Sequence, residues 1–393
     1  MNTLAKVLAA LVALSIVAVS GFAGGIIYER FLADDAVVPT IGSVDLRRAV
    51  SEVSEIIEKN ALEPSADTSL TAGAISGMLE SLDDPYALYF DEQHYEFFNQ
   101  QNSGAFYGIG ITITNREDDL VVVSVIEETP AERAGLLADD VIVTIDGETR
   151  PKWDADEAVS RIRGEEGTDV TLGIRRGEAA DLIEFTITRA KIDLPNVEVE
   201  MLEDGVGYIR LYSFNQLSTR DLAEAIEELT SQGAEGFILD LRDNPGGLLS
   251  ASVEVSSLFV PDGVIVRVED RNGTLEEHRA TGDVVTDAPL VVLINGNSAS
   301  ASEIVGGALQ DYGRAILVGE QSFGKGSVQT IEELSFGGAV KLTTAHYLTP
   351  QGQVIDKHGL TPDVKVEMDA ELQADHATDT QLQKAVEVLK GEM

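Results

Sequence analysis

The chain has 393 residues, of which 44% are hydrophobic and only 11 are proline, so it is long enough to bury the cores of two or three globular domains. Its 68 acidic residues outnumber its 28 Lys and Arg residues and give a formal net charge of −40, which argues against nucleic-acid binding because such a surface repels phosphate groups. There are no cysteines, which excludes thiol catalysis, disulfides and cysteine-based zinc sites.

Residues 8–27 form a nearly uninterrupted apolar run, close to the length of about 20 residues that crosses a bilayer. Lys6 precedes the run and Glu29 follows it, so the positive-inside rule places the N-terminus in the cytoplasm and the rest of the chain outside. We therefore predict an uncleaved membrane anchor. The alternative is a signal peptide cleaved near Gly21 or Ala23, and both interpretations export the body of the protein.

Residues 31–103 are predicted to form a helical region. Apolar positions recur at helical spacing over 44–60 and over 71–82, and the pattern stops before Pro85. Aromatic residues are then concentrated within 86–98. We interpret them as ordinary helical packing.

Residues 104–190 have the pattern of a separate β-rich domain with two helices. A glycine-bracketed turn at Gly108-Ile109-Gly110 runs into an alternating strand pattern, and a short helical segment follows at 129–136. This order resembles a PDZ domain of the bacterial protease type. The resemblance implies that the backbone N–H groups of the turn hold the terminal carboxylate of a peptide, and consecutive N–H groups in a glycine turn do form an anion-binding nest. The alternative is a small domain that contributes only stability.

From Met201 onward the pattern changes to α/β. Apolar strands are predicted at 206–211, 236–241, 289–294, 315–319 and 339–345, with helices at 219–229, 248–260 and 303–311. The sequence after residue 369 is acidic and helix-prone, and we predict a solvated end helix there.

The glycine-rich segment that contains Lys325 admits three interpretations. Gly319 and Gly324 match most of a phosphate-binding P-loop, but Gly326 stands where that motif needs Ser or Thr to hold magnesium, and a strand-like pattern follows where a helix is needed. Ser322 and Lys325 fit the Ser-x-x-Lys pair of penicillin-recognising acyl enzymes. Their companion motifs are absent, however, and Gly324 is a poor helix residue.

The third interpretation pairs Lys325 with a serine of the turn Ser298-Ala-Ser-Ala-Ser302. That turn follows an apolar strand and begins a helix, where free backbone N–H groups can stabilise a negative charge on a substrate oxygen. The chain has no Gly-x-Ser-x-Gly elbow and its 5 histidines form no evident triad, so a serine hydrolase here needs a lysine base. Phe323 and Val328 flank Lys325, which suits a desolvated amine with a lowered pKa. The pattern alone does not choose among the three serines.

Five motifs, taken together and in this order, resemble those of the carboxyl-terminal processing peptidases, also called tail-specific proteases. The motifs are Arg242-Asp-Asn-Pro-Gly-Gly247, Ser298-Ala-Ser-Ala-Ser-Glu-Ile304, Gln310-Asp-Tyr-Gly-Arg-Ala315, Gly319-Glu-x-x-Phe-Gly-Lys-Gly-x-Val-Gln329 and Tyr347-Leu-Thr-Pro-Gln-Gly352. The resemblance covers roughly residues 40–365. It implies a PDZ-containing Ser–Lys serine protease with an α/β core of the crotonase/Clp-protease-like type and with no metal or cofactor. We accordingly divide the chain into an anchor or signal segment, a helical region, a PDZ domain, a peptidase core and an acidic tail helix, at 1–30, 31–103, 104–190, 191–365 and 366–393.

The resemblance also assigns roles to individual residues. The family places its nucleophile 25 positions before the lysine, and 325 − 300 = 25, which implies that Ser300 attacks the substrate. Lys325 is then the general base and Gln329 the residue that positions it. The oxyanion hole is expected from the N–H groups of Gly246 and Ala301, and a Pro-Gly-Gly turn beside a helix N-terminus can supply such donors.

Four further residues receive structural roles. Ser298 and Ser302 are expected to be turn or cap residues. Asp311 matches an acidic position of the family but is interpreted as structural, because a Ser–Lys mechanism needs no third acid. Arg242 is expected to pair with a carboxylate near the site or in the PDZ domain.

The sequence thus predicts a serine endopeptidase of the bacterial periplasm or cell envelope that recognises substrate C-termini through a PDZ domain. Expected partners are proteins or peptides with free C-termini and the inner membrane, while an envelope adaptor and a homo-oligomer stay open. The alternative from another class is a catalytically silent PDZ scaffold that binds C-termini. The joint presence of Ser300, Lys325 and Gln329 argues against that alternative.

Overall fold

The computed structural model describes residues 45–63, 67–116, 119–126, 128–150, 152–177, 182–193, 196–368 and 376–393. The membrane anchor or signal segment predicted at residues 8–27 lies outside these ranges. Within them, no helix is both long enough and apolar enough to span a bilayer.

The described part of the N-terminal region contains three helices and one short strand, α2 (Leu46–Asn60), α3 (Asp67–Glu80), β1 (Leu88–Phe90) and α4 (Glu92–Ser103). The two helices predicted from apolar spacing are therefore confirmed. The interpretation of the aromatic segment as helical packing is wrong for its first half, because β1 pairs in an antiparallel ladder with β18 (Ala339–Leu348) of the C-terminal half. The region is thus joined to the C-terminal half by a sheet.

The PDZ region folds around its own core, which includes Ile142, Ile145 and Leu172. A sheet of order β3-β4-β5-β7-β8, with β6 added beside β5, is accompanied by a two-stranded β2-β9 ladder. The elements are β2 (Ala105–Gly108), β3 (Ile111–Arg116), β4 (Asp119–Val125), α5 (Pro130–Ala134), β5 (Val141–Ile145), β6 (Glu148–Thr149), α6 (Ala155–Ile162), β7 (Asp169–Arg175), β8 (Ile183–Thr188) and β9 (Ala190–Asp193). The β-rich domain with two helices is confirmed.

The C-terminal half is built on a second sheet, of order β10-β11-β12-β15-β16-β19. The sheet is parallel except at β10, and β12 and β15 are buried along their whole length, as expected for strands covered on both faces. Its strands are β10 (Val197–Met201), β11 (Val206–Leu211), β12 (Gly236–Asp240), β15 (Leu290–Ile294), β16 (Ile316–Gly319) and β19 (Val364–Lys365), and a 3-10 turn at Glu203–Gly205 joins β10 to β11. Loops after β12, β15 and β16 carry Gly246, the serine turn and Lys325 respectively, so the parallel arrangement brings these predicted site residues to one edge.

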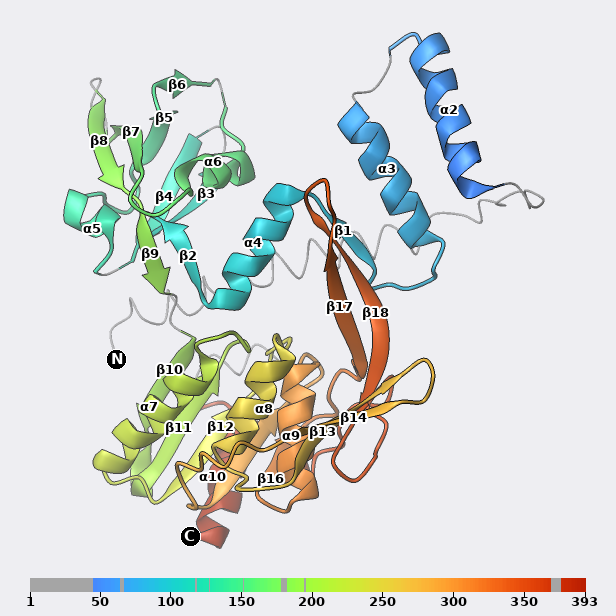
Figure 1. The fold of residues 1–393 in the computed structure, drawn as a ribbon. Coiled ribbons are helices and arrows are strands. Elements are labelled where there is room, and N and C mark those ends of the chain that lie inside the picture. Colours follow the sequence, from blue (N-terminus) through green and yellow to red (C-terminus); the bar gives the residue numbers. More distant parts are fainter. Residues whose placement is uncertain are drawn as a thin grey trace.

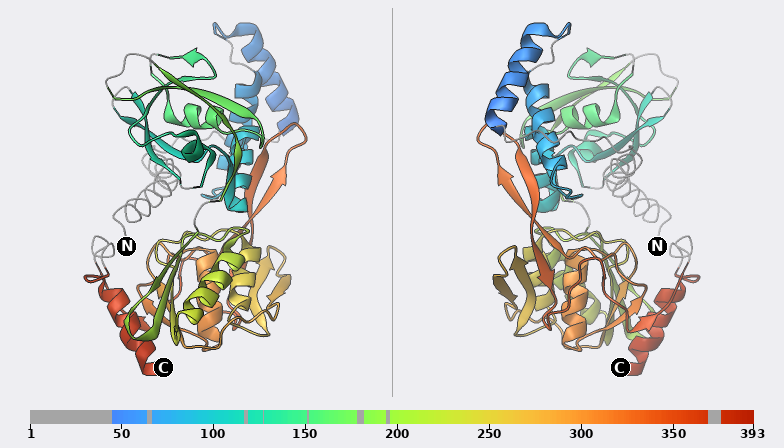
Figure 2. Two further views of the ribbon diagram at one scale, coloured as in Figure 1. Left: turned by 90° about the vertical axis from the view of Figure 1, so that its left-hand side faces the viewer. Right: turned by 90° about the vertical axis from the view of Figure 1, so that its right-hand side faces the viewer.

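Helices cover both faces of this sheet (Figures 1 and 2). One face packs against α7 (Ser218–Ser231), α8 (Leu249–Ser257) and α9 (Ala301–Asp311), and the other against α10 (Thr380–Glu392). The end helix predicted after residue 369 therefore exists, but the prediction that it is solvated is wrong. Leu382, Ala385 and Leu389 are buried and form part of the core on that face.

A third sheet connects this core to the N-terminal region. β17 (Ser327–Glu333) and β18 form a long hairpin that rises from the core toward β1, and β13 (Val264–Asp270) and β14 (Leu275–Arg279) extend the sheet on the other side of β18 (Figure 1). The hairpin begins two residues after Lys325. The part of β18 around His346, which pairs with Ser327, therefore lies close to that lysine.

Candidate active site

The serine turn lies between β15 and α9. The hydroxyl of Ser298 donates to the carbonyl of Leu241, and that of Ser302 donates to the carbonyl of Asn244, both in buried positions. These two serines hold the turn in place. Ser300 is only partly buried, and its φ of 55° is a strained value for a residue with a Cβ. Such strain at the start of a helix is typical of a side chain held in position for chemistry.

Gly246 approaches this turn closely. A Cβ added to Gly246 would lie 2.7 Å from Cβ of Ser300 and 2.8 Å from N of Ala301, so only glycine fits there. Ala301 N–H donates to no group in the described part of the chain, whereas Gly246 N–H donates to Oδ1 of Asn244 at 2.9 Å. Both expected oxyanion donors thus lie beside Ser300, and in this structure the Ala301 N–H is free.

Lys325 lies in a largely dry environment. Burial lowers its pKa to about 8, the charge of Lys341 lowers it as well, and Glu303 acts in the opposite direction. About one amine in ten is therefore neutral at pH 7, far more than for an ordinary lysine. Lys325 Nζ is 4.9 Å from the centre of the Tyr86 ring, and among the described hydrogen bonds none joins it to Ser300 Oγ.

Glu303 connects the serine turn to the lysine loop, and sequence analysis assigned it no role. Its buried carboxylate accepts hydrogen bonds from Ser300 N (2.8 Å), Lys325 N (2.9 Å), Gly324 N (2.7 Å) and Ser322 Oγ (2.6 Å). Burial raises its pKa, while these donors act against the rise. The Ser-x-x-Glu spacing of a capping box was a signal that could have found it.

Gln329 and Tyr347, both in the β17–β18 hairpin, also belong to the candidate site. Gln329 Nε2 donates to the carbonyl and the hydroxyl of Ser327, at 3.1 and 2.8 Å, so the predicted positioning residue contacts Ser327 rather than the lysine amine. The hydroxyl of Tyr347 donates to the carbonyl of Lys325. Burial and the charge of Glu303 raise the pKa of Tyr347, while a hydrogen bond with the Ser300 side chain acts in the opposite direction. Tyr347 therefore contacts both halves of the predicted dyad.

The structure also bears on the two rival interpretations of the lysine loop. The segment after Lys325 is strand β17 rather than the helix that a P-loop requires. Ser322 Oγ donates to Glu303 and accepts from Leu360 N, so its contacts are with these groups and not with Lys325. The geometry thus favours pairing Lys325 with the serine turn.

The PDZ glycine turn lies between β2 and β3. Gly110 has a φ of 87°, and a Cβ there would meet Thr129 at 2.3 Å, so glycine is required. Among the described groups, none accepts from the N–H of Ile109 or Gly110. Arg163 lies beside Gly108, with its guanidinium over the rings of Phe97 and Phe106 at 4.9 and 4.7 Å. Burial lowers the pKa of Arg163 to about 10.

Comparison with known proteins decides the family. Residues 205–366 match Peptidase family S41, residues 121–176 match the PDZ domain, and residues 39–94 match the N-terminal domain of the activating protease CtpB. A carboxyl-terminal-processing protease of Synechocystis sp. is 40% identical over 85% of this chain and 80% of its own length. The corresponding protease of Bartonella bacilliformis is 43% identical over 77% of this chain and 70% of its own length. The chain belongs to the carboxyl-terminal processing proteases.

A solved structure agrees with this assignment. The photosystem II D1 C-terminal processing protease is 31% identical, with a TM-score of 0.50, and the match covers 86% of this chain and 96% of that one. The protein is therefore a serine-type peptidase with a PDZ domain, and its substrates are proteins with C-termini. The resemblance seen in the sequence is confirmed.

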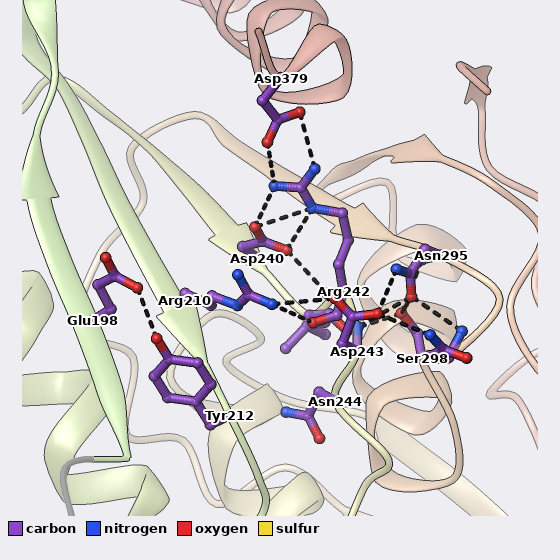
Figure 3. Close-up of polar contacts among 12 residues, drawn as sticks. Glu198, Arg210, Tyr212, Asp240, Arg242, Asp243, Asn244, Asn295, Ser298 and Asp379 are labelled. Atoms are coloured by element: carbon purple, nitrogen blue, oxygen red, sulfur yellow. Dashed lines mark hydrogen bonds and ion pairs between the residues drawn. The ribbon is translucent and has the colours of Figure 1, made fainter. Parts of the chain in front are cut away.

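In this processing protease the loop after β12 is fixed by a buried ion-pair network (Figure 3). The guanidinium of Arg242 bonds Asp240 at 2.6 Å and Asp379, the N-cap of α10, at 2.8 Å. Burial alone would raise the pKa of Asp240, but Arg242 lowers it to about 2. Arg242 thus pairs near the site, as expected, and its second partner comes from the tail helix rather than the PDZ domain.

Asn244 continues the same loop to the serine turn. Its Nδ2 donates to the carbonyl of Leu211, and its own carbonyl accepts from Ala299 N at 3.1 Å as well as from Ser302. Neighbouring Asp243 bonds the side chains of Asn295 and Asn297 at 2.9 Å (Figure 3). The Pro-Gly-Gly turn and the serine turn are therefore held as one unit.

Asp311 has a different place. It lies at the end of α9 and accepts from Gln351 N at 2.8 Å and Gln353 Nε2 at 3.3 Å. It fixes the turn after β18 and contacts no member of the predicted dyad in the hydrogen bonds described. In the described part of the chain, no group of three or more His, Asp or Glu side chains is arranged to hold a metal ion.

Proposed function

We propose that the protease cleaves peptide bonds through an acyl-enzyme formed on Ser300, with Lys325 as the general base. The observation that carries this proposal is the carboxylate of Glu303, which ties the backbone of Ser300 to the backbone of Lys325 while burial lowers the pKa of the lysine. A neutral amine is a competent base, and a pKa near the working pH is favourable for proton transfer.

In this mechanism Ser300 Oγ attacks the carbonyl carbon of the substrate and its proton passes to Lys325 Nζ. The negative charge on the tetrahedral oxygen is stabilised by the N–H of Ala301 and by that of Gly246, which exchanges Asn244 Oδ1 for the oxyanion. The intermediate collapses, Lys325 returns the proton to the leaving amine, and water then resolves the acyl-enzyme. Gln329 supports the lysine in the productive arrangement.

The PDZ turn selects the substrate in this proposal. The free N–H groups at Ile109 and Gly110, with Gly108 beside them, receive the terminal carboxylate, and the edge of β3 pairs with the extended tail. A protein held by its C-terminus is then presented to Ser300 at a high effective concentration.

Location in the cell envelope is part of the same proposal. It rests on the apolar run at residues 8–27 and the acidic residues that follow it. Membrane fractionation of the full-length chain, with protease protection of spheroplasts, tests it. Recovery of the intact chain in the cytosolic fraction would contradict it.

The dyad is tested by Ser300→Ala and Lys325→Ala, assayed on an unstructured protein. Both variants are expected to lose cleavage, and wild-type rates in both would sink the mechanism. Labelling by a serine-directed phosphonate, located by mass spectrometry, separates a peptidase from a silent PDZ scaffold. The peptidase is expected to be labelled at Ser300, and a scaffold is not.

A further inference from the structure

The segment that precedes α4, residues 84–90, lies against Lys325, the proposed base. Asp84 anchors this segment to β18, since its carboxylate accepts from Thr343 N at 3.0 Å and from the Thr343 hydroxyl at 3.1 Å. The same carboxylate accepts from Tyr86 N at 2.9 Å, which fixes the start of the turn. Strand β1 then continues the ladder, with Leu88 opposite Lys341.

This anchoring places the aromatic ring of Tyr86 over the amine of Lys325, at 4.9 Å from Nζ to the ring centre. The ring displaces water from one side of the amine, and this desolvation disfavours the charged form; it outweighs the weaker attraction between a ring face and a cation, because burial is the largest influence on the pKa of Lys325. Phe323, the neighbour expected to shield the lysine, is instead 57% exposed. The side chain that covers the base thus comes from a segment more than 200 residues earlier in the chain.

A second lysine belongs to the same cluster. Lys341 Nζ lies 5.5 Å from the centre of the Phe90 ring, and burial lowers its pKa while Asp84 raises it. Its positive charge disfavours the charged form of Lys325. Segment 84–90 therefore supplies the Tyr86 ring over Lys325. It also supplies the Phe90 ring and the Asp84 carboxylate beside Lys341.

We propose that Tyr86 is a positioning residue for the catalytic base, and that docking of segment 84–90 on β18 is what keeps the amine of Lys325 dry and in place. This inference rests on the Ser–Lys mechanism proposed above. It makes the N-terminal region part of the catalytic centre, since a chain in which this segment leaves β18 has a hydrated, protonated lysine.

The charged and titratable groups around this amine come from several elements. Tyr86 belongs to the docked segment, Lys341 and Tyr347 to β18, and Glu303 to α9, while Asp84 and Asp356 influence the Tyr86 hydroxyl. A lysine that loses the cover of Tyr86 becomes exposed to water, and its pKa moves toward the ordinary value. Because the neutral amine is the active form, the acid limb of the pH profile then moves to higher pH.

The test compares Tyr86→Leu with Tyr86→Phe in the full-length protein, using kcat/KM on an unstructured protein as a function of pH. The leucine variant is expected to lose about tenfold or more at pH 7, with its acid limb displaced to higher pH. The phenylalanine variant, which keeps the ring, is expected to recover most of the activity and the original limb. Phe336→Leu, which replaces a 64% exposed aromatic side chain in the turn between β17 and β18, outside the docked segment, is the matched control.

A purely structural role for Tyr86 predicts a uniform loss at all pH values together with a lower Tm, and that result would overturn the inference. So would a leucine variant with wild-type kcat/KM and an unmoved limb. Lys325→Ala, measured in parallel, separates this inference from the mechanism beneath it. An active Lys325→Ala rejects the dyad itself, whereas an inactive Lys325→Ala beside a normal Tyr86→Leu rejects only the role of Tyr86.

Discussion

The backbone N–H groups of Ser300 and Lys325 donate to the same carboxylate oxygen, Oε2 of Glu303, at 2.8 and 2.9 Å. The other oxygen, Oε1, accepts from Ser322 and Gly324. One side chain therefore fixes the serine turn relative to the lysine loop. Each carboxylate oxygen accepts two of the four hydrogen bonds. An ionised carboxylate can do this, because both of its oxygens are acceptors.

The first prediction concerns this carboxylate. Glu303→Gln puts an NH₂ group where two backbone or hydroxyl donors now point, so two hydrogen bonds to a charged group are lost and replaced by repulsion. At about 1.5–3 kcal/mol for each bond, kcat/KM is expected to fall by about two to four orders of magnitude. Steady-state cleavage of an unstructured protein measures the loss.

Glu332→Gln is the control for that measurement, because Glu332 is an exposed glutamate of β17. It is expected to keep wild-type activity. Equal activity of Glu303→Gln and the wild type would show that the link between the two loops is dispensable.

The second prediction concerns pH. In the proposed mechanism activity requires neutral Lys325, whose pKa is about 8, so kcat/KM is expected to rise with pH and to level off above about pH 8. Lys341→Met removes a nearby positive charge, which raises the pKa of Lys325. The increase of kcat/KM with pH is then expected at higher pH, and activity at pH 7 is expected to be severalfold lower. Lys341→Arg keeps the charge and is expected to restore the profile. A methionine variant with an unchanged profile would mean that the two lysines do not interact.

The core of the peptidase could be predicted from sequence because its signals are local. Buried parallel strands such as β12 and β15 are short apolar runs, and α9 has helical apolar spacing. The loops after these strands carry the candidate site, so strand prediction placed the serine turn and the lysine loop at one edge of the sheet, while the choice of Ser300 came from the family resemblance.

The groups around the site were not predictable in this way because their partners are distant in sequence. Tyr86 lies next to Lys325 only because β1 joins β18, and an isolated aromatic cluster gives no sign of that pairing. The tail helix is different. Leu382, Ala385 and Leu389 have the spacing of a buried helical face, a signal that its acidic composition obscured.

The third prediction concerns the tail helix and stability. Asp379→Ala leaves Arg242 buried with one carboxylate partner instead of two, beside Gln381, and removes the N-cap of α10. Breaking a buried pair in this way costs about 3–5 kcal/mol of unfolding free energy, which urea denaturation at pH 7 measures. Asp204→Asn breaks the exposed ion pair between the same helix and the core, through Lys390, and is expected to cost about 1 kcal/mol or less. Equal losses in the two variants would contradict a special role for the buried network.

The same network gives an acid dependence with a definite sign. The pKa of Asp240 is lowered from its ordinary value of 3.8 to about 2, so its ionised form is favoured in the folded state. Its contribution to stability is complete above pH 3.8 and is lost as the pH falls through 2. In Asp240→Asn that contribution is absent, so the variant is expected to show a smaller loss of stability over this interval than the wild type in acid unfolding followed by circular dichroism.

The fourth prediction tests the PDZ turn through the charge of the ligand. A peptide with a free C-terminus is expected to bind at least about tenfold more tightly than the same peptide with a C-terminal amide, because N–H donors bind a carboxylate more strongly than a neutral group. Gly110→Ala pushes a Cβ into Thr129 and displaces the turn, so it is expected to bind both peptides equally weakly. Gly147→Ala has a similarly positive φ of 77° but open space around it, and it is expected to retain the distinction at some cost in Tm. Fluorescence anisotropy with the Ser300→Ala protein measures binding without cleavage, and equal affinity of the wild-type turn for both peptides would place carboxylate recognition elsewhere.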